Sequence, residues 1–259
     1  LMRRFGEFVH SLSGRYITAE DVGMETRDMD IVREVTPFVT GISESKGGAG
    51  NPSPITAYGV FMGMKAAAKF KYGSDILEDK NIFVQGIGNV GEALVEHLAN
   101  EGAKVTISDI SQERLQEVKS KYDVTIYGGS DIYSEEMDIY APCALGATIN
   151  DNTINKLRAD IIAGAANNQL ANELRHGTLL QERGIVYAPD FLINAGGIIN
   201  VYAELENYGK AEIMRKTENI YNTTLEIFEN ARQNNLSTHN AALNIAIDRI
   251  ATRKRENAK

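Results

Sequence analysis

Three glycines and one aspartate form the pattern with the clearest chemistry in this sequence. Gly86, Gly88 and Gly91 have the spacing G-x-G-x-x-G, and Asp109 follows the last glycine by about eighteen residues. In a dinucleotide site the first glycine permits a tight turn, the second lets the backbone approach a pyrophosphate, and the third lets a helix pack closely on its strand. An acidic side chain at the end of the next strand accepts hydrogen bonds from the adenosine ribose. Because the Asp109 carboxylate would repel a 2′-phosphate, the pattern predicts NAD rather than NADP.

The elements around the glycines are those that such a site needs. The apolar run 82–84 predicts a buried strand, Leu94 and Leu98 mark the apolar face of a helix, and residues 104–108 predict a second strand. The helix N-terminus presents unpaired N–H groups and the positive end of its macrodipole to phosphates. Strand, helix, strand and acid in this order favour a dinucleotide site over a βαβ turn without a ligand. The predicted cofactor-binding residues of this segment are Gly86, Gly88, Asn89, Val90, Gly91 and Asp109.

The rest of the chain predicts an α/β fold, a doubly wound parallel sheet of the Rossmann type. Short apolar runs alternate with helical patterns, and strands joined by helices pair in parallel. We expect strands at 82–84, 104–108, 124–127, 137–141, 160–163 and 185–188. We expect helices at 2–10, 30–35, 53–72, from 111, at 151–158 and from 194, then one long amphipathic helix that includes residues 213–231, and another over 240–254.

A segment rich in glycine, serine and proline, residues 45–54, is the clearest internal boundary. Lys46 stands beside Gly47 and Gly48, but the spacing G-x-x-x-x-G-K-[ST] of a phosphate-binding loop is absent. A flexible hinge is therefore favoured. We expect three parts: residues 1–50, an NAD-binding Rossmann domain over 51–203, and C-terminal helices over 204–259 that pack back between the domains.

Composition excludes several classes of function. The net charge of −8 over 259 residues argues against a general nucleic-acid-binding protein, which needs a basic surface. No apolar run is as long as a membrane span, and no secretory signal opens the chain. The single cysteine, Cys143, excludes an internal disulfide and a cysteine-cluster metal site, and the four histidines have no ligand spacing. We therefore expect a cytoplasmic protein that binds no metal, nucleic acid or membrane.

Four polar or small segments follow predicted strands, where ligands bind in open α/β sheets. They are 86–91, 141–146, 164–169 and 194–197, and together they would line a nicotinamide cleft. Cys143 and Ala144 are predicted cofactor contacts, with Cys143 packing rather than acting as a nucleophile because no histidine and acid partner is evident. Asn167 and Asn168 carry amides that suit a carboxamide or a substrate carboxylate, and equally suit a turn. These patterns alone predict an NAD-dependent oxidoreductase.

Several segments together resemble the amino-acid dehydrogenases that act on glutamate, leucine, phenylalanine and valine. The matching segments are GRYITAEDVG (14–23), GNPSPITAYGV (50–60), QGIGNVGEALVEHL (85–98), APCALG (141–146), AGAANNQL (163–170) and YAPDFLINAGGIINV (187–201). They run through nearly the whole chain in the order of that family. They are most similar to its leucine-specific branch.

The resemblance implies reversible, NAD-dependent oxidative deamination of an L-amino acid to a 2-oxo acid and ammonia by a homo-oligomer. Asp21, in the segment TAED, matches the aspartate that moves protons to and from the substrate nitrogen. Thr56 and Asn167 match residues at the nicotinamide carboxamide. The residues that match the substrate pocket are Ala19, Ile198, Val201 and, more weakly, Asn168.

The pocket residues imply the substrate class. Ala19, Ile198 and Val201 are small or aliphatic, so they suit L-leucine and other branched-chain amino acids and offer no partner to a glutamate side chain. Discrimination among branched chains is modest, because one methylene is worth only about 1–3 kcal/mol. A valine or phenylalanine dehydrogenase is an alternative, as is a non-catalytic NAD-binding protein.

One departure from the family concerns its catalytic lysine. In the family that lysine lies in a GGGK segment upstream of the part that matches residues 14–23, as does a second lysine that binds the substrate carboxylate. The 259 residues contain no GGGK, and Lys46 follows the aspartate motif instead of preceding it. Leu1 is also not an initiator residue. We therefore expect a fragment in which residues 1–50 are the remnant of a substrate domain, and which binds NAD without turning over amino acid.

Overall fold

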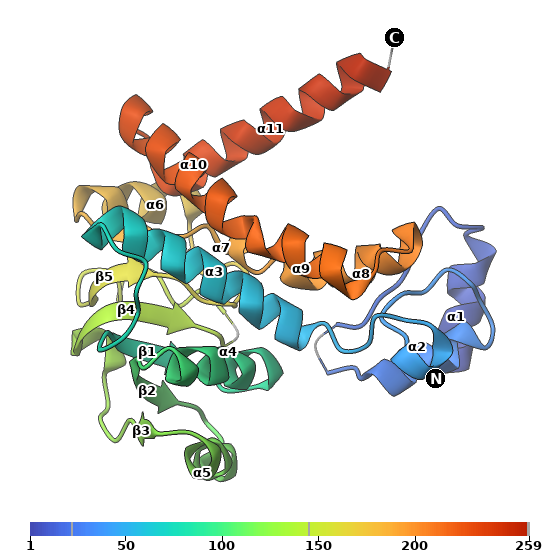
Figure 1. Cartoon of the computed structure of the whole chain (residues 1–259), viewed down its shortest axis with the longest axis horizontal. Coiled ribbons are helices and arrows are strands. Elements are labelled where there is room, and N and C mark those ends of the chain that lie inside the picture. The colour runs from blue at the N-terminus through green and yellow to red at the C-terminus, as the bar shows by residue number, and fades with distance from the viewer. Residues whose placement is uncertain (22, 145, 258–259) are drawn as a thin grey trace.

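A six-stranded parallel sheet forms the centre of the molecule (Figure 1). The computed structural model describes residues 1–21, 23–144 and 146–257. The strand order is β3-β2-β1-β4-β5-β6, and all five neighbouring pairs are parallel. The chain moves outward from β1 and then starts again at β4, which is the doubly wound arrangement predicted from the sequence. The strands are β1 (Asn81–Gln85), β2 (Lys104–Ser108), β3 (Val124–Ile126), β4 (Glu136–Pro142), β5 (Arg158–Ile162) and β6 (Val186–Tyr187).

Burial of both faces of the sheet explains why its strands were recognisable in the sequence. Val84, Ile107, Ile139 and Ile161 come from four strands, and all are fully buried. Helices cover both faces of a parallel sheet, so its strands read as continuous apolar runs. Each predicted strand lies within two residues of the observed one at either end.

The helix α3 (Ser53–Tyr72) is the most buried helix of the fold and joins the sheet to the C-terminal helices. Val60, Met64 and Ala67 are fully buried, which is typical of a helix with apolar residues on all sides. Figure 1 shows α3 lying along the sheet, with α4 on one side and α10 on the other. The other helices of this region are α4 (Asn89–Asn100), α5 (Gln112–Lys121), α6 (Glu173–Glu182), α7 (Asp190–Ile193) and the 3₁₀ turn η2 (Ile132–Ser134).

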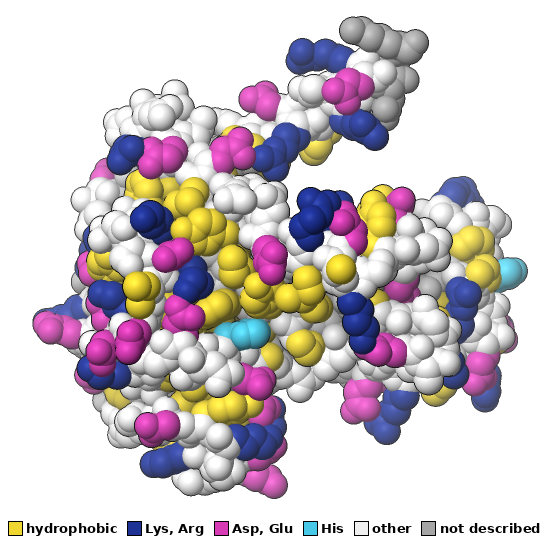
Figure 2. Space-filling model, viewed as in Figure 1, with side chains coloured by type: hydrophobic (Ala, Val, Ile, Leu, Met, Phe, Trp, Pro, Cys, Tyr) yellow, Lys and Arg dark blue, Asp and Glu magenta, His cyan; other side chains and the backbone are white. Residues whose placement is uncertain are grey.

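The C-terminal helices pack over α3, except for the last one, which extends away from it (Figure 1). They are α8 (Gly196–Glu206), α9 (Lys210–Glu218), α10 (Ile220–Asn234) and α11 (Thr238–Asn257). Ala241 and Ala242 at the start of α11 pack against Ile227 and Ala231 of α10. Farther along α11, Ile250 is 61% exposed. Figures 1 and 2 show this part of α11 extending clear of the helices beneath it.

The prediction of one long helix through residues 213–231 was wrong. The chain forms two helices that meet at Asn219. The Asn219 side chain accepts a hydrogen bond from Asn222 Nδ2 at 3.2 Å. Asparagine favours helix ends because its short polar side chain forms such local bonds, so the continuous apolar pattern did not reveal the break.

The predicted helix at 151–158 was also wrong, because side chains there satisfy the backbone in other ways. Residues 151–156 form turns, and β5 begins at Arg158. The Thr153 hydroxyl accepts from the Asn150 N–H at 3.0 Å and donates to the Thr148 carbonyl at 2.6 Å. Such side-chain bonds to the backbone compete with helix formation.

Residues before α3 build a small core of their own. This part contains α1 (Met2–Ser11), α2 (Thr26–Arg33) and the 3₁₀ turn η1 (Glu44–Lys46). Met29, Val32, Val39 and Ile42 form its buried cluster. The segments 15–21 and 38–42 meet in an isolated parallel bridge between Thr18 and Val39. This separate cluster is compatible with the predicted boundary near residue 50.

The described residues contain neither a membrane-spanning helix nor a cluster of metal ligands. No helix in this part of the chain is long and apolar enough to cross a membrane. The same residues contain no group of three or more histidine, cysteine, aspartate or glutamate side chains placed to hold a metal ion.

Candidate functional site

The glycine turn between β1 and α4 has the geometry that its spacing predicted. Gly86 has φ = +94°, and a Cβ there would lie 2.7 Å from the Ala144 nitrogen. A Cβ on Gly91 would lie 2.1 Å from the Gly86 carbonyl oxygen. A side chain at either position would therefore collide with backbone, and the positive φ at Gly86 adds strain for any other residue. These two glycines hold α4 close to the end of β1.

Gly88 is different, because the space beside it is open. An added Cβ would meet no atom within 4 Å. Gly88 is the exposed N-cap of α4, and the first N–H groups of a helix have no partner within the helix. This open space at a helix N-terminus is a cradle for an anion, and it fits the pyrophosphate of a dinucleotide.

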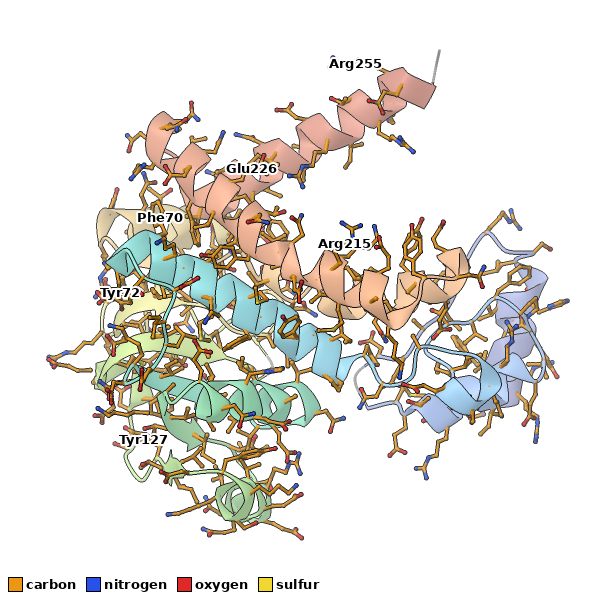
Figure 3. All side chains as sticks on the ribbon, in the orientation of Figure 1. Phe70, Tyr72, Tyr127, Arg215, Glu226 and Arg255 are labelled. Carbon is orange, nitrogen blue, oxygen red and sulfur yellow. The ribbon has the colours of Figure 1, made fainter. Side chains whose placement is uncertain are left out.

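A cavity of about 580 Å³ lies beside this turn. Such a volume is typical of sites that bind small molecules and cofactors. Tyr127, labelled in Figure 3, contributes from the segment that follows β3. The described residues that line the cavity are Gln85, Gly86, Gly88, Ser108, Asp109, Ile110, Tyr127, Gly129, Ser130, Ile132, Cys143 and Ala144. The structure thus brings the glycine turn, Asp109 and the bend after β4 together around one cavity.

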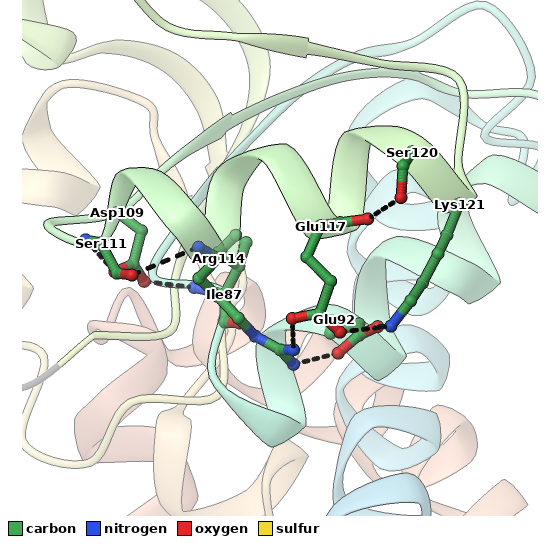
Figure 4. A network of polar contacts seen from close by, with 8 residues as sticks. All are labelled: Ile87, Glu92, Asp109, Ser111, Arg114, Glu117, Ser120 and Lys121. Atoms are coloured by element: carbon green, nitrogen blue, oxygen red, sulfur yellow. Dashed lines mark hydrogen bonds and ion pairs between the residues drawn. The ribbon is translucent and has the colours of Figure 1, made fainter.

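Asp109 both lines the cavity and holds the glycine turn. Its Oδ2 accepts a hydrogen bond from the Ile87 N–H at 2.8 Å, and its Oδ1 accepts one from the Ser111 N–H at 2.9 Å (Figure 4). A carboxylate has about four lone-pair sites, so each oxygen keeps capacity for one more donor. The two hydroxyls of an adenosine ribose are donors of this kind.

Cys143 and Ala144 line the same cavity and pack against Gly86 of the glycine turn. The Cys143 N–H donates to the Gln85 carbonyl at 2.7 Å, which fixes the bend after β4 against β1. The Cys143 sulfur accepts a long hydrogen bond from the Ala165 N–H at 3.5 Å. Burial raises the pKa of the Cys143 thiol to about 11, so the thiol is neutral near pH 7. This supports the interpretation of Cys143 as a packing residue rather than a nucleophile.

Thr56 and Asn167 meet the same short segment at the start of α8. Asn194 Nδ2 donates to the Asn167 Oδ1 at 2.6 Å. A Cβ on Gly197 would lie 2.7 Å from the Thr56 Oγ1, so the two residues touch. The Thr56 hydroxyl donates to the Pro52 carbonyl at 3.0 Å, which leaves its oxygen as an acceptor. An acceptor on Thr56 and an amide NH₂ on Asn167 are complementary to the two halves of a carboxamide.

The helix α8 carries two predicted pocket residues and also holds the N-terminal part of the chain. The Glu204 Oε1 accepts from the Gly41 N–H at 2.9 Å and from the Ala49 N–H at 2.7 Å. Residues three apart are neighbours on one face of a helix, so Val201 lies on the side of α8 that carries Glu204. Val201 is 9% exposed, whereas Ile198 is 65% exposed.

Ala19 and Asp21 lie close to the segment that Glu204 holds. A Cβ on Gly41 would lie 3.4 Å from the Glu20 nitrogen, so Gly41 packs against the backbone between Ala19 and Asp21. Asp21 is exposed, and Ala19 is partly buried. The predicted substrate residues of the two parts of the chain are therefore connected through Glu204 and Gly41.

The Glu20 side chain bonds to Thr26 and so does not share the proton-transfer role predicted for its neighbour Asp21. Thr26 Oγ1 donates to the Glu20 Oε2 at 3.0 Å. Burial of the carboxyl raises the pKa of Glu20, and the bond from Thr26 opposes that rise. The Glu20 carboxylate is therefore engaged by Thr26 within the N-terminal part of the chain.

Asn168 lies apart from the other predicted pocket residues. It has φ = +54°, a left-handed conformation that asparagine tolerates in turns. It lines a different cavity of about 490 Å³ with Ala147, residues 170–174 and no other described residue of the predicted pocket. The left-handed conformation of Asn168 supports its interpretation as a turn residue.

Several residues that line the site were not predicted. Tyr127, Gly129 and Ser130 follow β3, at the same edge of the sheet as the glycine turn. The run of glycines and serine at 128–130 is a turn signal after a predicted strand, so it could have been included with the other strand ends. The roles of Arg114 and Glu204 could not be predicted in this way. Arg114 bonds to Ile87 and Glu204 to Gly41, and in both cases the partner is distant in the sequence.

Comparisons with known proteins agree with this architecture. The family model described as Glutamate/Leucine/Phenylalanine/Valine dehydrogenase matches residues 47–113 and 107–257. A leucine dehydrogenase from Bacillus cereus is 51% identical over 254 residues, which are 98% of this chain and 69% of that protein. An L-tryptophan dehydrogenase from Nostoc punctiforme is 44% identical over 259 residues, which are 100% of this chain and 72% of that protein. The crystal structure of the Nostoc punctiforme enzyme matches with a TM-score of 0.84 and 43% identity over 98% of this chain and 73% of that one.

We predict that Gly88→Ala weakens cofactor binding without unfolding the protein. Gly88 has φ = −63°, which alanine adopts, and its Cβ meets no protein atom. The methyl group would instead occupy the place of the pyrophosphate, so the Kd for NAD⁺ should rise by about tenfold or more. Isothermal titration calorimetry measures the Kd, and a thermal melt confirms the fold. The matched control, Gly86→Ala, should lower Tm, and unchanged NAD⁺ affinity in Gly88→Ala would show that the pyrophosphate binds elsewhere.

Proposed function

The chain belongs to the glutamate, leucine, phenylalanine and valine dehydrogenase family, and from this premise we propose that it is the NAD-binding part of an enzyme that deaminates branched-chain L-amino acids. The proposed reaction is reversible and yields a 2-oxo acid and ammonia. Its substrates are L-leucine and related amino acids, and its cofactor is NAD.

The observation that carries the proposal is the open glycine turn beside Asp109. Gly88 leaves room for a pyrophosphate at the N-terminus of α4. Asp109 retains acceptor capacity for two ribose hydroxyls, and its charge disfavours a 2′-phosphate. Cys143 and Ala144, which line the same cavity beside Gly86, would contact the cofactor.

The proposed chemistry divides between the cofactor and this chain. Bound NAD supplies a nicotinamide ring that accepts the hydride leaving the substrate Cα. Thr56 and Asn167 orient the carboxamide of that ring through an acceptor and a donor. Asp21 moves protons to and from the substrate nitrogen, a task for an acid of suitable pKa within hydrogen-bonding reach.

The preference for branched chains rests on the apolar character of three residues. Ala19, Ile198 and Val201 offer contact area to an aliphatic side chain and no charge to a carboxylate. Glu204 and Gly41 connect the two parts of the chain that supply them. The exposure of Ile198 leaves it available to a substrate.

A second candidate function is deamination of an aromatic amino acid. Similarity to the L-tryptophan dehydrogenase of Nostoc punctiforme supports it, at 44% identity against 51% for the leucine enzyme of Bacillus cereus. The open surroundings of Ile198 also leave space for a larger side chain.

We also propose how the chain is organised. Residues 1–50 belong to a substrate domain, 51–203 bind NAD, and 204–259 return toward the space between them. The separate core around Met29 and Val32 supports the first boundary. Leu243, Ile247 and Ile250 are exposed on one face of α11 and support association into homo-oligomers, since apolar side chains gathered at a surface mark contact regions. The expected location is the cytoplasm.

We predict that the chain binds NAD⁺ more tightly than NADP⁺, and that Asp109→Ser narrows the difference. The variant removes the carboxylate that repels the 2′-phosphate, so the ratio of the two Kd values should fall by about tenfold or more. Calorimetric titration with each nucleotide measures it. Because Asp109 also holds the Ile87 N–H, the affinity for NAD⁺ itself should decrease, and only the ratio is diagnostic.

Asp123→Ser is the matched control for this experiment. Asp123 is exposed just before β3, at the opposite edge of the sheet, and should leave both Kd values unchanged. A ratio that stays the same in Asp109→Ser would contradict the role of Asp109 in cofactor selection.

We predict that the 259-residue chain alone does not produce NADH from L-leucine. It contains no GGGK segment before residues 14–23, so it lacks the lysine that the family reaction needs. The absorbance of NADH at increasing L-leucine measures turnover, with the Bacillus cereus leucine dehydrogenase as a positive control. Leucine-dependent NADH formation by this chain would refute the prediction and assign the chemistry to its own residues.

The amino-acid preference is tested on the product of the complete gene. We expect kcat/KM to be highest for L-leucine, L-isoleucine and L-valine. L-Valine has one methylene fewer than the other two, a difference that changes kcat/KM by about 10–200-fold. L-Glutamate should be much poorer, because no pocket residue pairs with its side chain. Higher kcat/KM for L-tryptophan or L-phenylalanine would establish the aromatic alternative instead.

A further inference from the structure

Arg114 belongs to α5, yet its side chain reaches the glycine turn. Its Nε donates to the Ile87 carbonyl at 3.1 Å. Ile87 stands between Gly86 and Gly88, and its N–H donates to the Asp109 Oδ2 at 2.8 Å. Both polar groups of the central residue of the turn are thus held by side chains that follow β2.

Two carboxylates hold the Arg114 guanidinium in place (Figure 4). Glu117, one turn along α5, pairs with it at 2.6 Å. Glu92 pairs with it from the first turn of α4, and its side chain is only 17% exposed. Lys121 joins the same two carboxylates at 2.9 Å and 2.6 Å. The four side chains form one network that spans α4, α5 and the glycine turn.

The charges in this network balance. Arg114 and Lys121 carry two positive charges, and Glu92 and Glu117 carry two negative charges. The planar guanidinium is already engaged by one backbone carbonyl and two carboxylates, which suits its fixed fork of donors. The positive charge of Arg114 is therefore offset within the network, and three of its five N–H groups bind protein acceptors, which disfavours a role as a direct phosphate ligand.

We propose that Arg114 is a positioning residue for the dinucleotide, an inference that rests on the proposed function of this site. By fixing the Ile87 carbonyl, it orients the peptide that leads into Gly88 and the N-terminus of α4. Glu92 holds the first turn of α4 through the same guanidinium, and its N–H donates to the Gly88 carbonyl at 2.9 Å. The turn is thereby ordered before the ligand arrives, so binding does not need to order it.

The test compares ligands that contain a pyrophosphate with one that does not. Arg114→Gln should raise the Kd for NAD⁺ and for ADP-ribose by about tenfold, measured by calorimetry. Adenosine binding, followed by ligand-observed NMR, should be unchanged because adenosine does not contact the glycine turn. Arg114→Lys should show the same loss, since one ammonium cannot replace the fork that joins Ile87, Glu92 and Glu117. Arg249→Gln, which removes an exposed ion pair with Glu226 on distant helices, is the matched control.

The outcomes separate this inference from the function on which it rests. If the parent chain binds no NAD⁺, the proposed function fails. If the parent binds and Arg114→Gln binds equally tightly, or loses adenosine by the same factor, the positioning role is overturned. Should Arg114→Gln fail to fold, Glu117→Gln decides, because it removes a carboxylate that orients the Arg114 guanidinium toward the Ile87 carbonyl. It should weaken NAD⁺ and spare adenosine, and unchanged NAD⁺ affinity would overturn the inference.

Discussion

The close contact between α4 and the end of β1 is the constraint on which the candidate site depends. The Gly86 carbonyl oxygen lies so near Gly91 that a Cβ there would be 2.1 Å away. This approach places the N-terminus of α4 directly after the strand, so its unpaired N–H groups meet the carboxyl edge of the sheet. The bend at Cys143 and Ala144 packs against Gly86 from the other side. The cavity beside Asp109 is the space that these contacts leave.

The glycines alone would not make this turn rigid, because glycine permits many conformations. Rigidity comes from the two side chains that hold Ile87, Asp109 at its N–H and Arg114 at its carbonyl. The Asp109 carboxylate keeps acceptor capacity on both oxygens, whereas the Arg114 guanidinium binds one backbone carbonyl and two carboxylates of the protein. The same small region therefore contains one charged group that lines the cavity and one that supports the backbone.

Much of this fold was predictable because its signals are local. Short buried strands, a glycine spacing and an apolar helix each leave a mark within a few residues, and the strands were located to within two residues. The errors arose where polar side chains decide the backbone, at Thr153 and at Asn219, since their bonds leave the apolar pattern intact. Arg114 and its carbonyl partner Ile87 are 27 residues apart, and nothing near either residue indicates the other. The motif residues that line the cavity were therefore predictable from the sequence, whereas Arg114, which supports the motif, was not.

The connection between the two parts of the chain has a different physical character from the site itself. One oxygen of Glu204 accepts both the Gly41 and the Ala49 N–H, and Lys210 of α9 pairs with the exposed Glu44 at 3.0 Å. Partly exposed polar contacts of this kind are weak compared with an apolar core, and interfaces built from them permit relative motion of domains. Ala19 and Asp21 lie on one side of this connection, and Ile198 and Val201 on the other. The weak polar contacts of Glu204 and Lys210 therefore let the two parts of the chain change their relative position.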